Sequence, residues 1–387
     1  MGNVPNLRFP EFTEVWKVER LDEIATLSKG VGISKEQLSN DGEPCILYGE
    51  LYTKYKSEII KEIDSRTNID NSKLKRSKAN DVIIPCSGET AIDIATARCV
   101  PFDNILLGGD LNIISLYQYD GAFMSYQLNG KRKYDIAKVA QGVSVVHLYG
   151  EHLKAIFIYN PCLQEQQKIA QILSLLDERI ATQNKIIEDL KKLKSAIIDR
   201  LYENIDGPPC LYGDLLTVVN EKNKMMEYSN ILSASQEFGM IERNDLNIDI
   251  KYEKNAITGY KIVREGDYVV HLRSFQGGMA FSQMVGVCSP AYIILRPNDR
   301  LSYGYLAPYF TSTSFINSLR LVTYGIRDGR SINVDEWLNM KVCIPSLEVQ
   351  RHILSIINSI ECKLLNEIKI ADNLLKQRSY LLSQMFI

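Results

Sequence analysis

A heptad stripe is the feature that most constrains this chain. Between residues 164 and 202, apolar side chains recur at alternating steps of four and three, and no Gly or Pro interrupts the stretch. Apolar residues fill eight of the ten stripe positions, which are Ile169, Leu173, Leu176, Ile180, Gln183, Ile187, Leu190, Lys194, Ile197 and Leu201. So narrow a stripe is typical of the seam of a long coiled-coil helix. At about 1.5 Å per residue the predicted helix is about 60 Å long.

The same pattern returns 184 residues later. The ten corresponding positions are Ile353, Ile357, Ile360, Leu364, Glu367, Ala371, Leu374, Arg378, Leu381 and Met385. Its polar exceptions coincide with those of the first stripe, since Glu367 corresponds to Gln183 and Arg378 to Lys194. Each stripe follows a proline and a short acidic segment, 161–166 and 345–350, which suit the first turn of a helix. We therefore interpret the chain as an internal duplication.

The segments between the stripes repeat the same order of elements. Strands are predicted at 81–85 and 111–116, and similar strands follow in the second copy at 266–270 and 291–295. A Gly-Pro-Pro turn at 207–209 begins the second copy. The predicted fold class is α+β. It consists of two duplicated mixed α/β domains separated by two long helices. The predicted segments are a first domain at 1–163, a central helix at 164–203, a second domain at 204–346 and a C-terminal helix at 347–387.

Composition excludes several classes of protein. A formal net charge of −2 gives no overall attraction to nucleic acid, so any basic surface must be local. The eight cysteines contain no C-x-x-C pair and fit neither a zinc site nor a disulfide framework, which predicts buried free thiols in a reducing compartment. No signal peptide or membrane-spanning apolar run is present, so we predict a cytoplasmic protein without a membrane partner.

Motifs for catalysis are missing from the sequence. Residues 160–162 fail the D/N-P-P-Y/F motif of amino methylation, and no phosphate-binding loop for a nucleotide occurs. Residues 367–369 have the E-x-K spacing of some nucleases, but they lie in the predicted coil without a neighbouring metal carboxylate. We predict a recognition component that is not an enzyme, with no catalytic residue, no metal site and no cofactor of its own.

Three short motifs accompany the duplication. They are VPNLRFPEF at 4–12, QGVS at 141–144, and the proline at 161 followed by EQQKIA at 165–170. In this order, and over essentially the whole chain, they resemble the specificity subunit of type I restriction–modification systems, a form of host defence. Its members share a PxLRFPxF start and a P-x-x-x-E-Q-x-x-I beginning of the central helix.

The resemblance implies two target-recognition domains, each reading one half of a bipartite target in double-stranded DNA. It also implies that the two long helices pair as an antiparallel coiled coil with pseudo-two-fold symmetry and so fix the gap. It implies two methyltransferase subunits and restriction subunits as partners for DNA adenine methylation and cleavage. S-adenosylmethionine, ATP and Mg would be bound by those partner subunits.

Candidate DNA contacts follow from residue type, because Lys and Arg bind phosphates while Arg and Gln also read base edges. In the first domain they form a glycine-rich loop, an interleaved aromatic and basic segment, and a basic run before a turn: Lys29, Ser34, Lys35; Tyr48, Tyr52, Lys54; and Lys131, Arg132, Lys133, Gln141, Ser144. In the second domain they form two loops: Arg273, Ser274, Gln276; and Tyr324, Arg327, Arg330, Ser331.

Alternative interpretations stay open at this stage. The basic run could be a solvated surface, the tyrosines of 48–55 could pack the core, and Arg327 or Arg330 could bridge Asp328 or Asp335. Lys194 could approach Glu367 as a register pair, or both could be solvated at the edge of the seam. The whole chain could be a coiled-coil protein scaffold without DNA readout, or a degenerate methyltransferase or nuclease.

Overall fold

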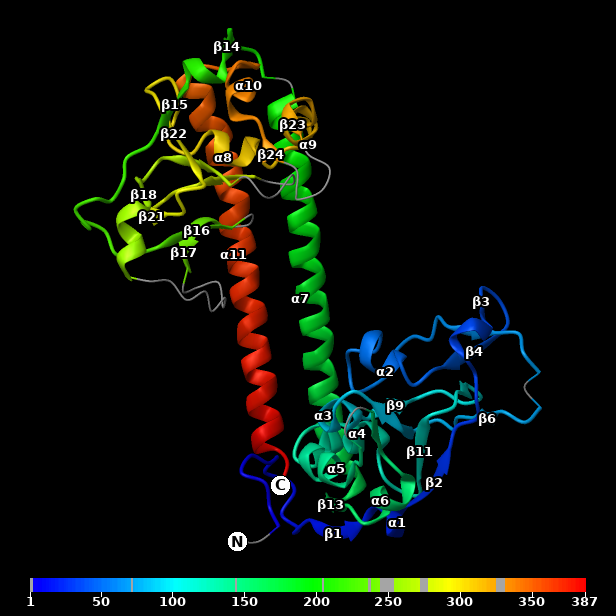
Figure 1. Ribbon diagram of the computed structural model, residues 1–387. Coiled ribbons are helices and arrows are strands. Elements are labelled where there is room, and N and C mark those ends of the chain that lie inside the picture. Colours follow the sequence, from blue (N-terminus) through cyan, green and yellow to red (C-terminus); the bar gives the residue numbers. More distant parts are fainter. Residues whose placement is uncertain are drawn as a thin grey trace. The chain divides into compact units, whose positions relative to one another are not determined.

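The computed structural model describes residues 3–70, 72–142, 145–203, 205–235, 238–243, 254–271, 278–324 and 331–387. The chain forms two compact units. The first comprises Met1–Asn184 and Lys369–Ile387, and the second comprises Lys185–Ile368. The two long helices, α7 (Leu163–Glu203) and α11 (Leu347–Gln384), contribute residues to both units (Figure 1). The division into four segments predicted from the sequence stays a prediction.

The first unit contains short helices, a central four-stranded sheet and a five-stranded sheet. Its helices are α1 (Leu21–Ile24), η1 (Lys35–Gln37), α2 (Glu50–Thr53), α3 (Ala91–Ile94), α4 (Gly121–Asn129), α5 (Lys133–Val139) and α6 (Gly150–Lys154). Its strands are β1 (Lys17–Arg20), β2 (Ala25–Lys29), β3 (Leu38–Ser39), β4 (Glu43–Ile46), β5 (Arg66–Thr67), β6 (Lys75–Arg76), β7 (Asp81–Pro85), β8 (Ser87–Gly88), β9 (Arg98–Val100), β10 (Leu106–Leu107), β11 (Leu111–Leu116), β12 (Val146–His147) and β13 (Phe157–Asn160).

The second unit also contains short helices and a central four-stranded sheet. Its helices are η2 (Tyr212–Asp214), η4 (Lys254–Gly259), α8 (Leu306–Tyr309), α9 (Thr313–Ser318), η5 (Leu319–Val322) and α10 (Val334–Leu338). Its strands are β14 (Pro209–Leu211), β15 (Leu216–Val219), β16 (Leu232–Ser235), β17 (Gly239–Glu242), β18 (Lys261–Val263), β19 (Tyr268–Val270), β20 (Met279–Phe281), β21 (Gly286–Cys288), β22 (Ile293–Pro297), β23 (Thr323–Tyr324), β24 (Ser331–Ile332) and β25 (Lys341–Cys343).

The central sheets of the two units have the same topology. The first has the antiparallel order β2-β11-β7-β9 and the second the antiparallel order β15-β22-β19-β20. Alternate residues of a strand point to opposite faces. Accordingly Val82 and Ile84 of β7 join one hydrophobic cluster while Ile83 joins another, and Tyr268 and Val269 of β19 divide likewise. The predicted correspondence of 81–85 with 266–270, and of 111–116 with 291–295, is therefore confirmed.

One turn shows how closely the copies correspond. The residue before β7 is Asn80 with φ of 81°, and Gly266 has φ of 91° two residues before β19. Gly and Asn are the residues that adopt this left-handed conformation most readily. The next residue in each copy is a buried aspartate: Asp81 accepts a hydrogen bond from the amide of Lys78 at 2.8 Å, and Asp267 from that of Arg264 at 2.9 Å.

The start of each long helix repeats a second detail. Gln166 and Gln350 are both buried, and each donates its side-chain amide to the carbonyl of a proline five residues earlier, at 2.9 and 3.0 Å. The carbonyl oxygen of each side chain accepts a backbone amide, from Asp120 at 2.9 Å and from Ser302 at 2.7 Å. These buried, fully paired amides fix each helix start against its own domain.

The two helices run antiparallel within each unit. In the first unit Ile169 and Leu173, near the start of α7, pack with Met385, near the end of α11. In the second unit Ile198, near the end of α7, packs with Ile353 and Ile357, near the start of α11. Every stripe position of both helices is buried or half-buried. The predicted α+β fold class with two long helices is confirmed.

Two sequence expectations need correction. Lys194 does not pair with Glu367: its Nζ lies 2.6 Å from Oε1 of Glu361, and Glu367 pairs with Lys363 one helical turn away. The eight cysteines are all free, but Cys162, Cys343 and Cys362 are exposed and Cys210 is half-buried, so only the other four are buried thiols. Burial raises the pKa of Cys45 and Cys86 to about 11 and that of Cys99 and Cys288 to about 12.

Candidate nucleic-acid interface

Three loops of the first unit meet at a surface lined by glycines. The amide of Gly30 donates to the carbonyl of Leu111 at 2.9 Å, and the amide of Gly108 donates to that of Ile46 at 2.9 Å. A Cβ atom added to Gly30 would lie 2.0 Å from the carbonyl oxygen of Gly108, so only glycine permits this approach. The predicted glycine-rich loop and the segment that begins at Tyr48 are thereby brought together.

The predicted residues of this loop are exposed. Lys29 ends β2, and its Nζ lies 3.5 Å from Asp110 with 63% of its side chain exposed. Ser34 and Lys35 are exposed at the start of η1, where the amide of Ser34 donates to the side chain of Gln37. Tyr48 is 39% exposed. These four side chains remain available to a ligand.

A further group joins this surface through β8 and β12. The hydroxyl of Tyr52 donates to the carbonyl of Ser87 at 2.9 Å, and Ser87 Oγ lies 3.3 Å from Nδ1 of His147. His147 and Gln141 exchange backbone hydrogen bonds of 2.7 and 2.9 Å, which places Gln141 in the same group. Tyr149 is 53% exposed beside the His147 ring. We name Lys29, Tyr48, Ser87, Gln141, His147 and Tyr149 the recognition rim.

Sequence reasoning missed Ser87, His147 and Tyr149. The four histidines of the chain are dispersed in sequence, so nothing local marks His147 as part of a site. The Gly-Gly pair at 108–109, directly after a buried strand, was the signal that another segment approaches closely there.

Other predicted contacts are engaged within the protein. Lys54 Nζ lies 3.2 Å from Ser65 Oγ and 3.3 Å from Asp64, and Tyr55 is buried in the core. Arg132 donates to the carbonyl oxygen of Ile387 at 3.1 Å and stacks over Tyr159. Lys131 is exposed and Lys133 half-buried at the start of α5. Arg132 therefore holds the end of the chain, whereas its neighbour Lys131 faces solvent.

The residues that flank the two predicted loops of the second unit are paired with each other. His271 donates its amide to the carbonyl of Gly278 at 2.9 Å, and Tyr324 of β23 pairs with Ser331 of β24. The predicted contacts Arg273, Ser274, Gln276, Arg327 and Arg330, and Ser144 in the first unit, lie outside the described residues. Among the described elements, β24 precedes α10 in the second unit as β12 precedes α6 in the first.

Neutralising the exposed lysines tests this surface. Each lysine that binds a phosphate contributes about 0.9 to the slope of log K against log salt. Lys29→Gln combined with Lys35→Gln is therefore expected to reduce the slope by about 2. The measurement is DNA binding by the assembled complex over a salt series. Lys192→Gln is the matched control, because Lys192 is also exposed and paired with one carboxylate, and it should leave the slope unchanged.

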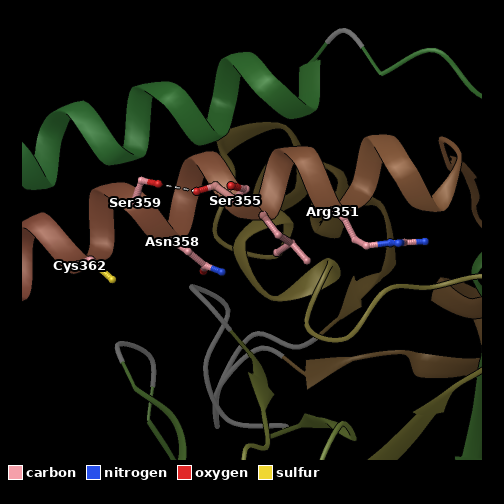
Figure 2. Close-up of a pocket in the computed structure, with 6 residues that line it drawn as sticks. Arg351, Ser355, Asn358, Ser359 and Cys362 are labelled. Carbon is pink, nitrogen blue, oxygen red and sulfur yellow. Dashed lines mark hydrogen bonds between the residues drawn. The ribbon is translucent and has the colours of Figure 1, made fainter.

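A shallow groove in the second unit runs along α11. It has a volume of about 540 Å³, and its lining consists of Arg351, Leu354, Ser355, Asn358, Ser359 and Cys362. Figure 2 shows Ser359 bonded to the backbone of Ser355 on the same helix rather than to a facing element. Arg351 is the one charged residue among these six lining residues, so they provide no cluster of charged groups.

In the part of the chain that the structure describes, no three His, Cys, Asp or Glu side chains are arranged to hold a metal ion. None of the helices described is both long and apolar enough to cross a membrane.

The chain is similar to known components of type I restriction–modification systems. The family model of the type I restriction modification DNA specificity domain matches residues 13–192. The chain is 28% identical over 200 residues to the type I restriction enzyme MjaVIII specificity subunit of Methanocaldococcus jannaschii. That match covers 51% of this chain and 43% of the relative, so the chain spans less than half the length of the curated relative it matches.

Solved structures share the fold along nearly the whole chain. The S subunit of a type I restriction-modification system from M. genitalium has a TM-score of 0.59 at 17% identity, and the match covers 99% of both chains. A structure reported on complex assembly and conformational transition of the type I R-M system has a TM-score of 0.61 at 15% identity and covers 97% of this chain and 98% of that one.

Proposed function

We propose that the chain is the subunit that reads a bipartite DNA target for a type I restriction–modification system, because residues 13–192 match the family model of the DNA specificity domain of such systems. Each unit would recognise one half of the target, and α7 with α11 would set the gap. Two methyltransferase subunits would modify adenines with S-adenosylmethionine, and restriction subunits would use ATP and Mg. The assembly would act in the cytoplasm.

The observation that carries this proposal is one scaffold used twice with different surfaces. The central sheets, the Gln166 and Gln350 bonds and the aspartate turns repeat between the units. The sequences between these shared elements differ: residues 141–144 read QGVS in the first unit, whereas residues 325–331 of the second read GIRDGRS and are more basic. A reader of two different half-sites at one spacing needs a repeated frame with divergent surfaces, because protein geometry sets half-site spacing.

The proposal also accounts for the low net charge. A charge of −2 on the whole chain is compatible with DNA binding when lysines gather locally, as Lys29 and Lys35 do on one loop. The exposed tyrosines of the recognition rim offer hydrogen bonding and stacking beside those cations.

Swapping one domain tests the function. The chain is expressed with the methyltransferase subunit of its own operon, and methylated adenines are mapped across the host genome. We expect a bipartite motif with a fixed gap, and replacement of residues 205–345 by those of a relative should change one half only. If the unmodified chain directs no methylation, or if the motif is continuous and the replacement leaves it unchanged, a protein scaffold is favoured instead.

A further inference from the structure

A charged cluster in the first unit joins three parts of the chain that are distant in sequence. Arg378 of α11 donates from Nε to Asp177 of α7 at 2.6 Å and from a terminal nitrogen to Glu58 at 2.5 Å. The side chains of Glu58 and Asp177 are 8% and 9% exposed, and that of Arg378 is 23% exposed. One guanidinium therefore connects both long helices to the domain that carries the recognition rim.

The two carboxylates have further partners inside the domain. Asp177 accepts the hydroxyl of Tyr126 at 2.7 Å, and Asn129 donates to Glu58 at 3.4 Å. Tyr126 and Asn129 belong to α4, which packs on β7 and β9 of the central sheet. The cluster thus reaches the sheet through α4.

The segment that carries Glu58 is itself part of the sheet edge. Cys99 of β9 donates its amide to the carbonyl of Glu58 at 2.7 Å, and Ile60 donates to that of Cys99 at 3.0 Å. Movement of Glu58 therefore requires movement of β9 and, with it, of the central sheet.

Charge in the cluster is balanced. The buried Arg98 lies close enough to Glu58, Asp177 and Arg378 to interact with them electrostatically, and its guanidinium donates to the carbonyls of Ala97 and Tyr55. Burial lowers the pKa of Arg98. For Arg378, burial alone would lower the pKa, but Glu58 and Asp177 raise it overall, so the cation is stabilised where it lies.

In the second unit the corresponding ion pair joins the two helices to each other and not to the domain. Lys194 and Glu361 lie 184 residues from Arg378 and Asp177 respectively, and their atoms approach to 2.6 Å. Lysine offers a single nitrogen where arginine offers a planar fork, so it suits one carboxylate rather than two. Here the domain is attached elsewhere, since Asp199 of α7 accepts the amide and hydroxyl of Thr313 at the start of α9.

We propose that Arg378 is a positioning residue that fixes the orientation of the first recognition domain on the helices, and so sets the gap length that the protein accepts. This inference rests on the proposed function. Lys194, its counterpart, would align the helices with each other only. Loss of Arg378 would let the first domain rotate against α7 and α11, and targets with the wrong gap would then be tolerated.

Gap selectivity is the measurement that tests this role. The complex with its methyltransferase subunits is assayed on duplexes whose two half-sites are separated by the natural gap or by one base pair more or less. Arg378→Gln is expected to lower the preference for the natural gap by about tenfold, and Arg378→Lys to restore part of it. Lys194→Gln, the matched control, should keep the preference within about twofold.

Different outcomes separate the two proposals. Glu58→Gln keeps the size of the side chain and removes one charge, so it should reproduce the loss of selectivity even where Arg378→Gln does not fold. Unchanged selectivity in a folded Arg378 or Glu58 variant, or an equal loss in Lys194→Gln, would overturn the positioning role alone. A wild-type complex that methylates no gapped target would contradict the proposed function and this role with it.

Discussion

Trp337→Ala is expected to lower the free energy of unfolding of the second unit by about 3–5 kcal/mol. Trp337 is fully buried, stacks on Tyr212 with ring centroids 4.3 Å apart, and meets the edges of Phe310 and Phe315. Truncation leaves a cavity among aromatic rings that the surrounding helices cannot collapse to fill. Urea unfolding with hydrogen exchange, which assigns the loss to this unit, is the measurement.

Trp337→Phe is the control for that substitution. The buried indole Nε1 has no hydrogen-bond partner among the described residues, so replacing the indole by a phenyl ring forfeits packing but none of the hydrogen bonds seen there. We expect clearly less destabilisation than with alanine, because most of the aromatic volume remains. Equal losses for the two variants would contradict a cavity as the cause.

Arg8→Ala is expected to destabilise the first unit by about 3–5 kcal/mol, the range found when one member of a buried ion pair is removed. Arg8 binds Glu165 through two hydrogen bonds of 2.7 Å, and the carboxylate is 0% exposed. Without Arg8, the described side chains would leave the Glu165 carboxylate one donor, the Trp16 Nε1 at 3.4 Å. The buried charge would lose most of its stabilisation, which the thermal midpoint of unfolding and hydrogen exchange in residues 163–173 would report.

The double variant Arg8→Ala with Glu165→Gln identifies the cause. If the unpaired buried charge is responsible, neutralising Glu165 should recover part of the lost stability. If the double variant is less stable than Arg8→Ala, packing of residues 3–12 rather than charge would be the dominant contribution. The second unit offers no equivalent pair, because Val349 stands where Glu165 stands in the first and is exposed.

The candidate site was less accessible to sequence reasoning than the fold. Lys29, Ser34, Lys35, Tyr48 and Gln141 could be singled out because their residue types and glycine neighbours are local properties. Whether a cation is free is not local: Lys54 lies among Ser65, Glu50 and Asp64, and Arg132 holds the end of the chain. Ser87 and His147 could not be joined from the sequence, since 60 residues separate them.

The sequence by itself determined the period of the two long helices, their place in a duplication, and the correspondence of Lys194 with Arg378. These follow from spacing, because a stripe at steps of four and three lies on one face of a helix wherever the chain folds. Only the tertiary structure decided which carboxylates those cations meet. Lys194 meets Glu361 rather than Glu367, and Arg378 meets Glu58, 320 residues away in sequence, because an ion pair depends on how whole elements pack and not on the residues beside it.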